Sequence, residues 1–229
     1  MLKNHKVFTL VFGIIFLLNI FTQSALLQDL NIFIKPLICI SLAFYLFKNA
    51  NMAAGFNRLV FVGLIFSLFG DCFLLFAGRD IYFFLYGLVS FLLAHVVYSF
   101  AFFRDFKNNP QASKIYGHLM FFILGVFTLS FYTFIRDYLN DFRIPVMVYM
   151  FVISIMAIMA AYRYKRVDLF SFRLILTGAV FFVISDAALA FNKFVEPYPF
   201  AGILIMSTYM LAQYLITIGA IERKVEVLI

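Results

Sequence analysis

Two aspartates lie inside long apolar runs of the sequence, Asp71 in SLFGDCFLLF and Asp186 in FFVISDAALAF. An acid near the middle of a membrane costs at least about 2.5–3.5 kcal/mol on insertion scales, so its presence points to function. The alternative is structural, because a protonated Asp can make a hydrogen bond between helices. We favour function for this pair. The other nine acids of the chain lie in loops, tails or segment ends, where we expect water to hydrate them.

Further polar residues accompany these acids. Lys35 begins the run KPLICI; it either extends to water at the membrane surface or reaches the layer of the acids. His95 and Tyr98 share one helical face with small residues, and so do Tyr209 and Gln213. Small and polar residues on one face of a spanning helix point into the bundle. Each of these four residues is either part of a site or a structural hydrogen-bonding group.

The elements that position these residues are membrane-spanning helices. Of 229 residues, 65% are hydrophobic and 13% charged, too few polar residues for a soluble domain of this length. The sequence therefore predicts an all-α fold, a polytopic transmembrane helical bundle formed by a single integral membrane domain, residues 1–229. A span needs about 20 apolar residues. Eight segments qualify: 7–24, 31–48, 57–76, 82–103, 118–135, 144–162, 172–191 and 198–221.

Basic residues predict how the bundle is oriented. With the N-terminus inside, thirteen of the eighteen Lys and Arg residues fall on the inner side and five on the outer side. The positive-inside rule then places both termini in the cytoplasm, and we expect the bacterial cytoplasmic membrane. In this orientation Asp71 and Asp186 lie at similar depth, each about 7 Å before the outer end of its segment.

Other functional classes find little support. The formal charge of +7 comes from basic residues between apolar runs, without a basic stripe, so we expect no nucleic-acid partner. The two cysteines, Cys39 and Cys72, form no metal-binding spacing, so we expect no metal site and no cofactor. The oligomeric state is left open.

The two halves of the chain resemble each other weakly. A shift of 115 residues takes Asp71 to Asp186 and Tyr98 to Gln213. This suggests two parallel four-helix halves with one Asp in each. Membrane proteins built from repeats often place their site at the interface between the repeats.

Several short motifs in this sequence resemble the YhhN-like family of eight-span membrane proteins, which includes the lysoplasmalogenases. They are KPL at 35–37, FGD at 69–71, G-x3-F-x3-H-x2-Y from Gly87 to Tyr98, PVMVY at 145–149, G-A-x-x-F-x-x-S-D from Gly178 to Asp186, and TYMLAQYLI at 208–216. The resemblance implies hydrolysis of the vinyl ether bond of a lysophospholipid, with release of a fatty aldehyde. It also implies a site lined by Lys35, Asp71, His95, Tyr98, Ser185, Asp186, Tyr209 and Gln213.

The residues are compatible with that chemistry. Vinyl ether hydrolysis begins with protonation of carbon and passes through an oxocarbenium-like cation. A carboxylic acid in a low-dielectric site stays protonated more readily and can donate that proton. A second, ionised carboxylate can stabilise the cation or activate water, as in glycoside hydrolysis. We therefore predict a catalytic pair of Asp71 and Asp186, with the roles unassigned. Lys35 would hold one Asp ionised or bind the lipid phosphate.

Two alternatives are kept open. A small-molecule or proton-coupled transporter would also use intramembrane acids and a repeat. The sequence lacks helices broken by Gly or Pro at matched positions, which argues mildly against transport. A non-catalytic membrane scaffold leaves the cost of two buried acids without a purpose.

Overall fold

The computed structural model describes residues 5–23 and 29–225, and within them the chain folds into eight α-helices. Two residues used in the sequence predictions lie outside the described part. They are residue 24, which ends the first predicted segment, and Lys3, one of the thirteen basic residues placed on the inner side. The helices are α1 (Lys6–Phe21), α2 (Asn31–Asn49), α3 (Gly55–Leu74), α4 (Ile81–Asn108), α5 (Ile115–Ile135), α6 (Arg143–Ala161), α7 (Leu169–Ala190) and α8 (Ala201–Ile221).

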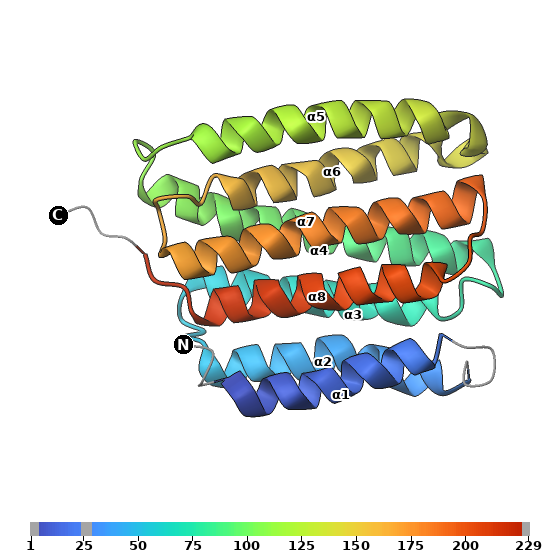
Figure 1. The fold of residues 1–229 in the computed structure, drawn as a ribbon, viewed down its shortest axis with the longest axis horizontal. Helices are drawn as coiled ribbons and strands as arrows, with labels where there is room; N and C mark the ends of the chain where they lie inside the picture. Colours follow the sequence, from blue (N-terminus) through green and yellow to red (C-terminus); the bar gives the residue numbers. More distant parts are fainter. Residues whose placement is uncertain (1–4, 24–28, 226–229) are drawn as a thin grey trace.

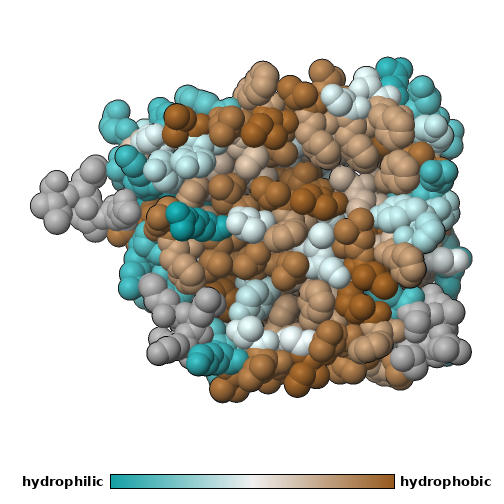
Figure 2. All heavy atoms as spheres, in the orientation of Figure 1, coloured by the Kyte–Doolittle hydropathy of each residue, from teal (hydrophilic) through white to brown (hydrophobic). Residues whose placement is uncertain are grey.

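The all-α, multi-pass membrane architecture predicted from the sequence is confirmed. Seven helices are long and apolar enough to cross a membrane. The remaining helix, α1, is apolar but has 16 residues, which span about 24 Å against a hydrocarbon core of about 30 Å. An eighth crossing by α1 therefore stays a prediction. In Figure 2 hydrophilic residues gather at the two ends of the helices and hydrophobic ones predominate between them.

The helices form three layers (Figure 1). The pair α1 and α2 lies on one side, and α5 and α6 lie on the other. Between them are α3, α4, α7 and α8, of which α3 packs closely on α4 and α7 on α8. The two helices that carry the acids, α3 and α7, run in the same direction, as a parallel repeat would require. The repeat itself stays a prediction.

The close packing of α7 on α8 depends on Gly178. A Cβ atom at this position would lie 2.9 Å from the carbonyl oxygen of Ala212, a backbone atom that cannot move aside easily. Gly125 in α5 has no neighbour within 4 Å of the corresponding point. The two glycines therefore provide a matched pair for testing this contact.

We expect Gly178→Ala to lower the free energy of unfolding by about 1–3 kcal/mol, because an added methyl group overpacks the helix interface. Gly125→Ala is expected to leave stability unchanged or to raise it by up to about 1 kcal/mol, since Ala favours the helix more than Gly does. Unfolding by SDS titration of both purified variants measures the difference. Equal stability of the two variants would contradict this prediction, because it would mean that α7 and α8 accommodate the added methyl group without cost.

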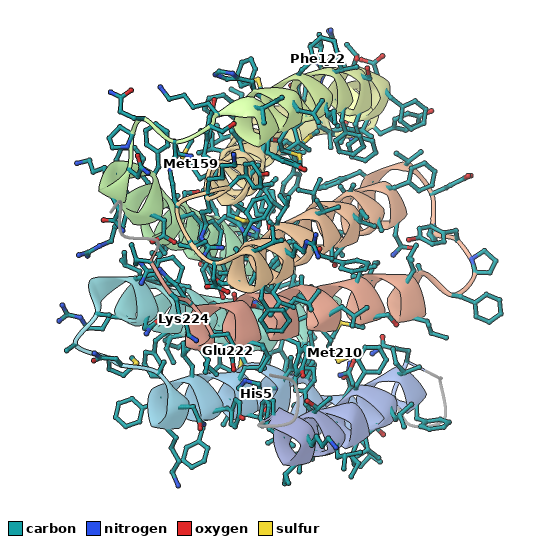
Figure 3. All side chains as sticks on the ribbon, turned by 60° about the vertical axis from the view of Figure 1, so that its left-hand side comes forward. His5, Phe122, Met159, Met210, Glu222 and Lys224 are labelled. Carbon is teal, nitrogen blue, oxygen red and sulfur yellow. The ribbon has the colours of Figure 1, made fainter. Side chains whose placement is uncertain are left out.

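Polar contacts tie the helices together at one end of the bundle. His5, which precedes α1, lies 2.7 Å from both the Tyr45 hydroxyl and a carboxylate oxygen of Glu222, which follows α8. Figure 3 shows His5 and Glu222 close together at this end. The start of α1 and the end of α8 thus lie on the same side, as the predicted orientation requires. Which side faces the cytoplasm stays a prediction.

The same end holds a buried ion cluster that the sequence analysis missed. Asp105 in α4 is 0% exposed, so the expectation that water hydrates it is wrong. The reason is that α4 extends to Asn108, beyond the predicted end at 103, and carries Asp105 under the loop after α6. Arg163 Nε lies 2.8 Å from Asp105 Oδ2, and Arg223 Nε lies 2.9 Å from Oδ1. Two guanidinium groups thereby compensate one buried carboxylate.

Candidate functional site

Asp71 lies near the C-terminal end of α3 and is 1% exposed. Its Oδ2 accepts a 2.6 Å hydrogen bond from the Tyr209 hydroxyl of α8 and a 3.5 Å contact from the Cys39 thiol of α2. Its Oδ1 lies 3.8 Å from Lys35 Nζ. Lys35 is itself buried, so of its two sequence-based interpretations the structure shows the one in which it reaches the acid layer. The positive charge and the two donors stabilise the ionised form of Asp71, whereas its burial acts against that form.

Asp71 is placed by a close approach of α3 to α4. A Cβ atom on the preceding Gly70 would lie 2.6 Å from ring atoms of Phe91 in α4. Because Gly70 has no side chain, the Phe91 ring packs against the α3 backbone. The same ring meets the Tyr209 ring edge-on, at a centroid distance of 5.7 Å. The aromatic contact thus orients the tyrosine that donates to Asp71.

A chain of hydrogen bonds leads away from Asp71 along α8. Gln213 Nε2 donates to the Tyr209 hydroxyl at 3.4 Å, and the Tyr98 hydroxyl of α4 donates to Gln213 Oε1 at 2.8 Å. All three side chains are buried. The sequence prediction that Tyr98, Tyr209 and Gln213 point into the bundle is therefore confirmed, while their part in a reaction stays a prediction.

Asp186 lies near the C-terminal end of α7 and has different partners. Its Oδ2 accepts a 2.5 Å hydrogen bond from the Tyr149 hydroxyl of α6 and lies 3.2 Å from His95 Nε2 of α4. His95 Nε2 also lies 3.0 Å from the Tyr149 hydroxyl, so the three groups form a triangle. The His95 ring is 0% exposed and Nδ1 has no hydrogen-bond partner among the described residues. Nε2 is therefore the ring nitrogen that faces both oxygen atoms.

The two acids do not contact each other. Neither a hydrogen bond nor an ion pair joins Asp71 to Asp186 in the described part of the chain. The Phe182 ring of α7 packs edge-on against the rings of both His95, at 4.7 Å, and Tyr209, at 5.6 Å, and so separates the two clusters. Cooperation between the acids through other groups stays a prediction.

Access also distinguishes the acids. A pocket between α4, α5, α6 and α7 is lined mainly by apolar side chains, with Asp186 and Tyr149 on its wall. The Asp186 side chain is 15% exposed and its Oδ1 has no hydrogen bond among the described residues. Asp71 does not line this pocket. A molecule in the pocket would therefore meet Asp186 first.

Ser185 and Tyr149 both lie close to Asp186, in the sequence and in space respectively. Ser185, predicted to line the site, donates a 2.9 Å hydrogen bond to the Ile205 carbonyl of α8, a contact that joins helices. Tyr149, which reasoning from the sequence did not include, donates to Asp186 directly. It is the last residue of the motif PVMVY, and that motif was the signal available for finding it. No group of three or more metal-ligating side chains occurs among the residues with described positions.

The comparison with protein families covers most of this chain. The model of the YhhN family matches residues 30–220, a range that includes every predicted site residue from Lys35 to Gln213. The chain belongs to the YhhN family. Its membership agrees with the resemblance seen in the short motifs. The matched range contains α2, α3, α4, α6, α7 and all but the last residue of α8, the helices that carry both clusters.

Several curated relatives bear the name lysoplasmalogenase. The chain is 36% identical to lysoplasmalogenase TMEM86A of Homo sapiens over 72% of this chain and 66% of that protein. It is 33% identical to lysoplasmalogenase TMEM86A of Bos taurus over the same shares. It is 26% identical to lysoplasmalogenase TMEM86B of Homo sapiens over 83% of this chain and 74% of that protein. No solved structure matches this chain.

Proposed function

We propose that this YhhN-family protein is a lysoplasmalogenase that hydrolyses the vinyl ether bond of lysophospholipids. The proposal rests on the position of Asp186. This residue lies on the wall of an apolar pocket, accepts a hydrogen bond from Tyr149 and lies near His95. A vinyl ether has no charge and joins the hydrocarbon chain of its lipid to the glycerol. A carboxylic acid that faces an apolar pocket is therefore well placed to protonate such a bond. The names of the relatives support the same activity.

Asp186 would act as the proton donor in its protonated form. Its proton goes to the β-carbon of the vinyl ether, which is the double-bond carbon not attached to oxygen. The double-bond electrons form the new C–H bond. The resulting oxocarbenium ion takes water, which loses a proton back to the carboxylate. The hemiacetal hydroxyl then gives its proton to the ether oxygen as the C–O bond breaks, which yields a fatty aldehyde and a glycerophospho alcohol. General acid catalysis of this kind contributes about 10²–10⁴-fold to rate.

Tyr149 and His95 would serve Asp186 as proton-exchanging and orienting partners. Both can carry a proton and both lie within 3.2 Å of Asp186 Oδ2, which leaves Oδ1 without a hydrogen bond among the described residues. Asp71 has another role in this proposal. With Lys35 as its partner it keeps Tyr209 in place against Phe91, and Phe91 is part of the pocket wall. Asp71 would then be a positioning residue for the wall that faces the substrate.

Aldehyde release by the purified protein in detergent tests the proposal. We expect aldehyde from a vinyl ether lysophospholipid and none from the matching alkyl ether, because only the vinyl ether has a carbon that can accept the proton. The matching ester controls for a general lysolipid hydrolase, which would release fatty acid. No aldehyde in detergent, together with solute uptake by sealed vesicles that contain the protein, would contradict the proposal and support a transporter.

A further inference from the structure

The pocket beside Asp186 has the chemistry of a hydrocarbon-binding site. Leu88 of α4, Phe131 of α5, Met150 of α6 and Ala187 of α7 contribute apolar walls. Within the described part of the chain, Asp186 is the one charged side chain that lines it. A pocket of this kind offers dispersion contacts along most of its length and a polar group at one place.

The pocket is bounded on one side by a loosely attached helix. α5 packs on α6 and does not pack closely on α7, so the wall between α5 and α7 consists of side chains such as Phe127, which is 38% exposed. The outer side of α5 faces away from the bundle, where Figure 3 shows Phe122 at its edge. In a membrane, this side of the pocket would face the hydrocarbon region.

Two hydroxyl groups that line the pocket are paired with each other. The hydroxyls of Thr128 in α5 and Ser154 in α6 lie 2.8 Å apart and both line the pocket. Because they bond to each other, neither needs a ligand. Along α7, the lining residues Val183 to Ala190 cover about 10 Å at the helical rise. Ala187 follows Asp186 directly and carries only a methyl group.

We propose that this pocket binds the single hydrocarbon chain of the lysolipid, which enters sideways from the bilayer between α5 and α7. The inference rests on the proposed function for the identity of the lipid, whereas the binding of the chain does not require its cleavage. Ala187 determines how bulky a chain fits beside Asp186. The apolar lining, the paired hydroxyls and the partly exposed Phe127 between α5 and α7 all fit a single chain better than a headgroup, which would need charged partners.

Photo-crosslinking tests where the chain lies. The probe is an alkyl ether lysophosphatidylethanolamine with a diazirine on its chain, which the protein cannot hydrolyse. We expect the label on α5 and α6 peptides, and we expect Ala187→Phe to lower the yield at least about five-fold, since a bulky side chain fills a packed apolar site. The matched control is Ile184→Phe, on the same helix but 43% exposed outside the pocket, and it should label like the natural protein.

A second pocket variant, Leu88→Phe on the facing wall, keeps the test valid if Ala187→Phe does not fold. Size-exclusion profiles of all variants show which of them are folded. Labelling confined to other helices, or equal labelling of pocket variants and the Ile184→Phe control, would overturn the proposal. The probe reports binding alone. Correct labelling without aldehyde release would therefore disprove the vinyl ether activity and leave the chain site standing.

Discussion

Replacing Asp186 with Asn is expected to lower kcat for vinyl ether hydrolysis by about 10²–10⁴-fold and to leave the protein folded. Asn has nearly the same shape and can still accept the hydrogen bond from Tyr149, but it has no carboxyl proton to donate. The loss should appear in kcat more than in KM, because the proton moves only in the transition state. Aldehyde release at saturating substrate measures it.

Two further variants sharpen this experiment. Asp71→Asn is expected to lose turnover as well, because Lys35 then faces no carboxylate and Tyr209 loses its charged acceptor. Asp80→Asn is the control, since Asp80 is an exposed residue that caps α4 and Asn caps helices equally well. Full activity in the purified Asp186→Asn protein would remove Asp186 as the proton donor, and full activity in Asp71→Asn would remove Asp71 from the reaction.

Replacing Asp105 with Asn is expected to lower the free energy of unfolding by about 3–5 kcal/mol, because breaking a buried ion pair leaves charge without compensation. Arg163 is 0% exposed and would keep its charge with only neutral partners such as the Ser171 hydroxyl, 2.9 Å away. Burial lowers the pKa of the Arg163 guanidinium, and the neighbouring carboxylate opposes that shift. SDS unfolding of the purified variant gives the change in stability.

Asp137→Asn is the matched control for this prediction. Asp137 also pairs with two arginines, Arg136 at 3.5 Å and Arg143 at 4.0 Å, but its side chain is 78% exposed. Water screens such a pair, so the loss should stay below about 1 kcal/mol. If Asp105→Asn destabilised the protein no more than Asp137→Asn does, the buried cluster would not contribute to stability as proposed.

The sequence was sufficient to predict the helices and their inward faces. Long apolar runs determine where a chain crosses a membrane, and the predicted segments agree with the helices to within a few residues except at the end of α4. Helical periodicity placed Tyr98, Tyr209 and Gln213 in the interior. Such patterns are local, and each reports on one helix at a time.

The partners of the buried groups could not be predicted in the same way. They depend on the rotation and the axial offset of neighbouring helices, which side-chain packing determines and no single-helix pattern reports. The apolar residues between the acids illustrate this. Phe182 looks like any other core residue in the sequence, yet its ring separates the Asp71 cluster from the Asp186 cluster. Asp105 was missed for a related reason, since its burial depends on the loop after α6.

The hydrogen bonds from Tyr98 through Gln213 to Tyr209 have a consequence for ion leakage across the membrane. Two hydroxyls in direct contact can pass a proton along by exchanging bonds, and a row of them would conduct. The Gln213 amide interrupts the row, because its NH₂ and carbonyl groups do not exchange protons as hydroxyls do. The hydrogen bonds that lead away from Asp71 therefore do not form an unbroken row of hydroxyls along which a proton could pass.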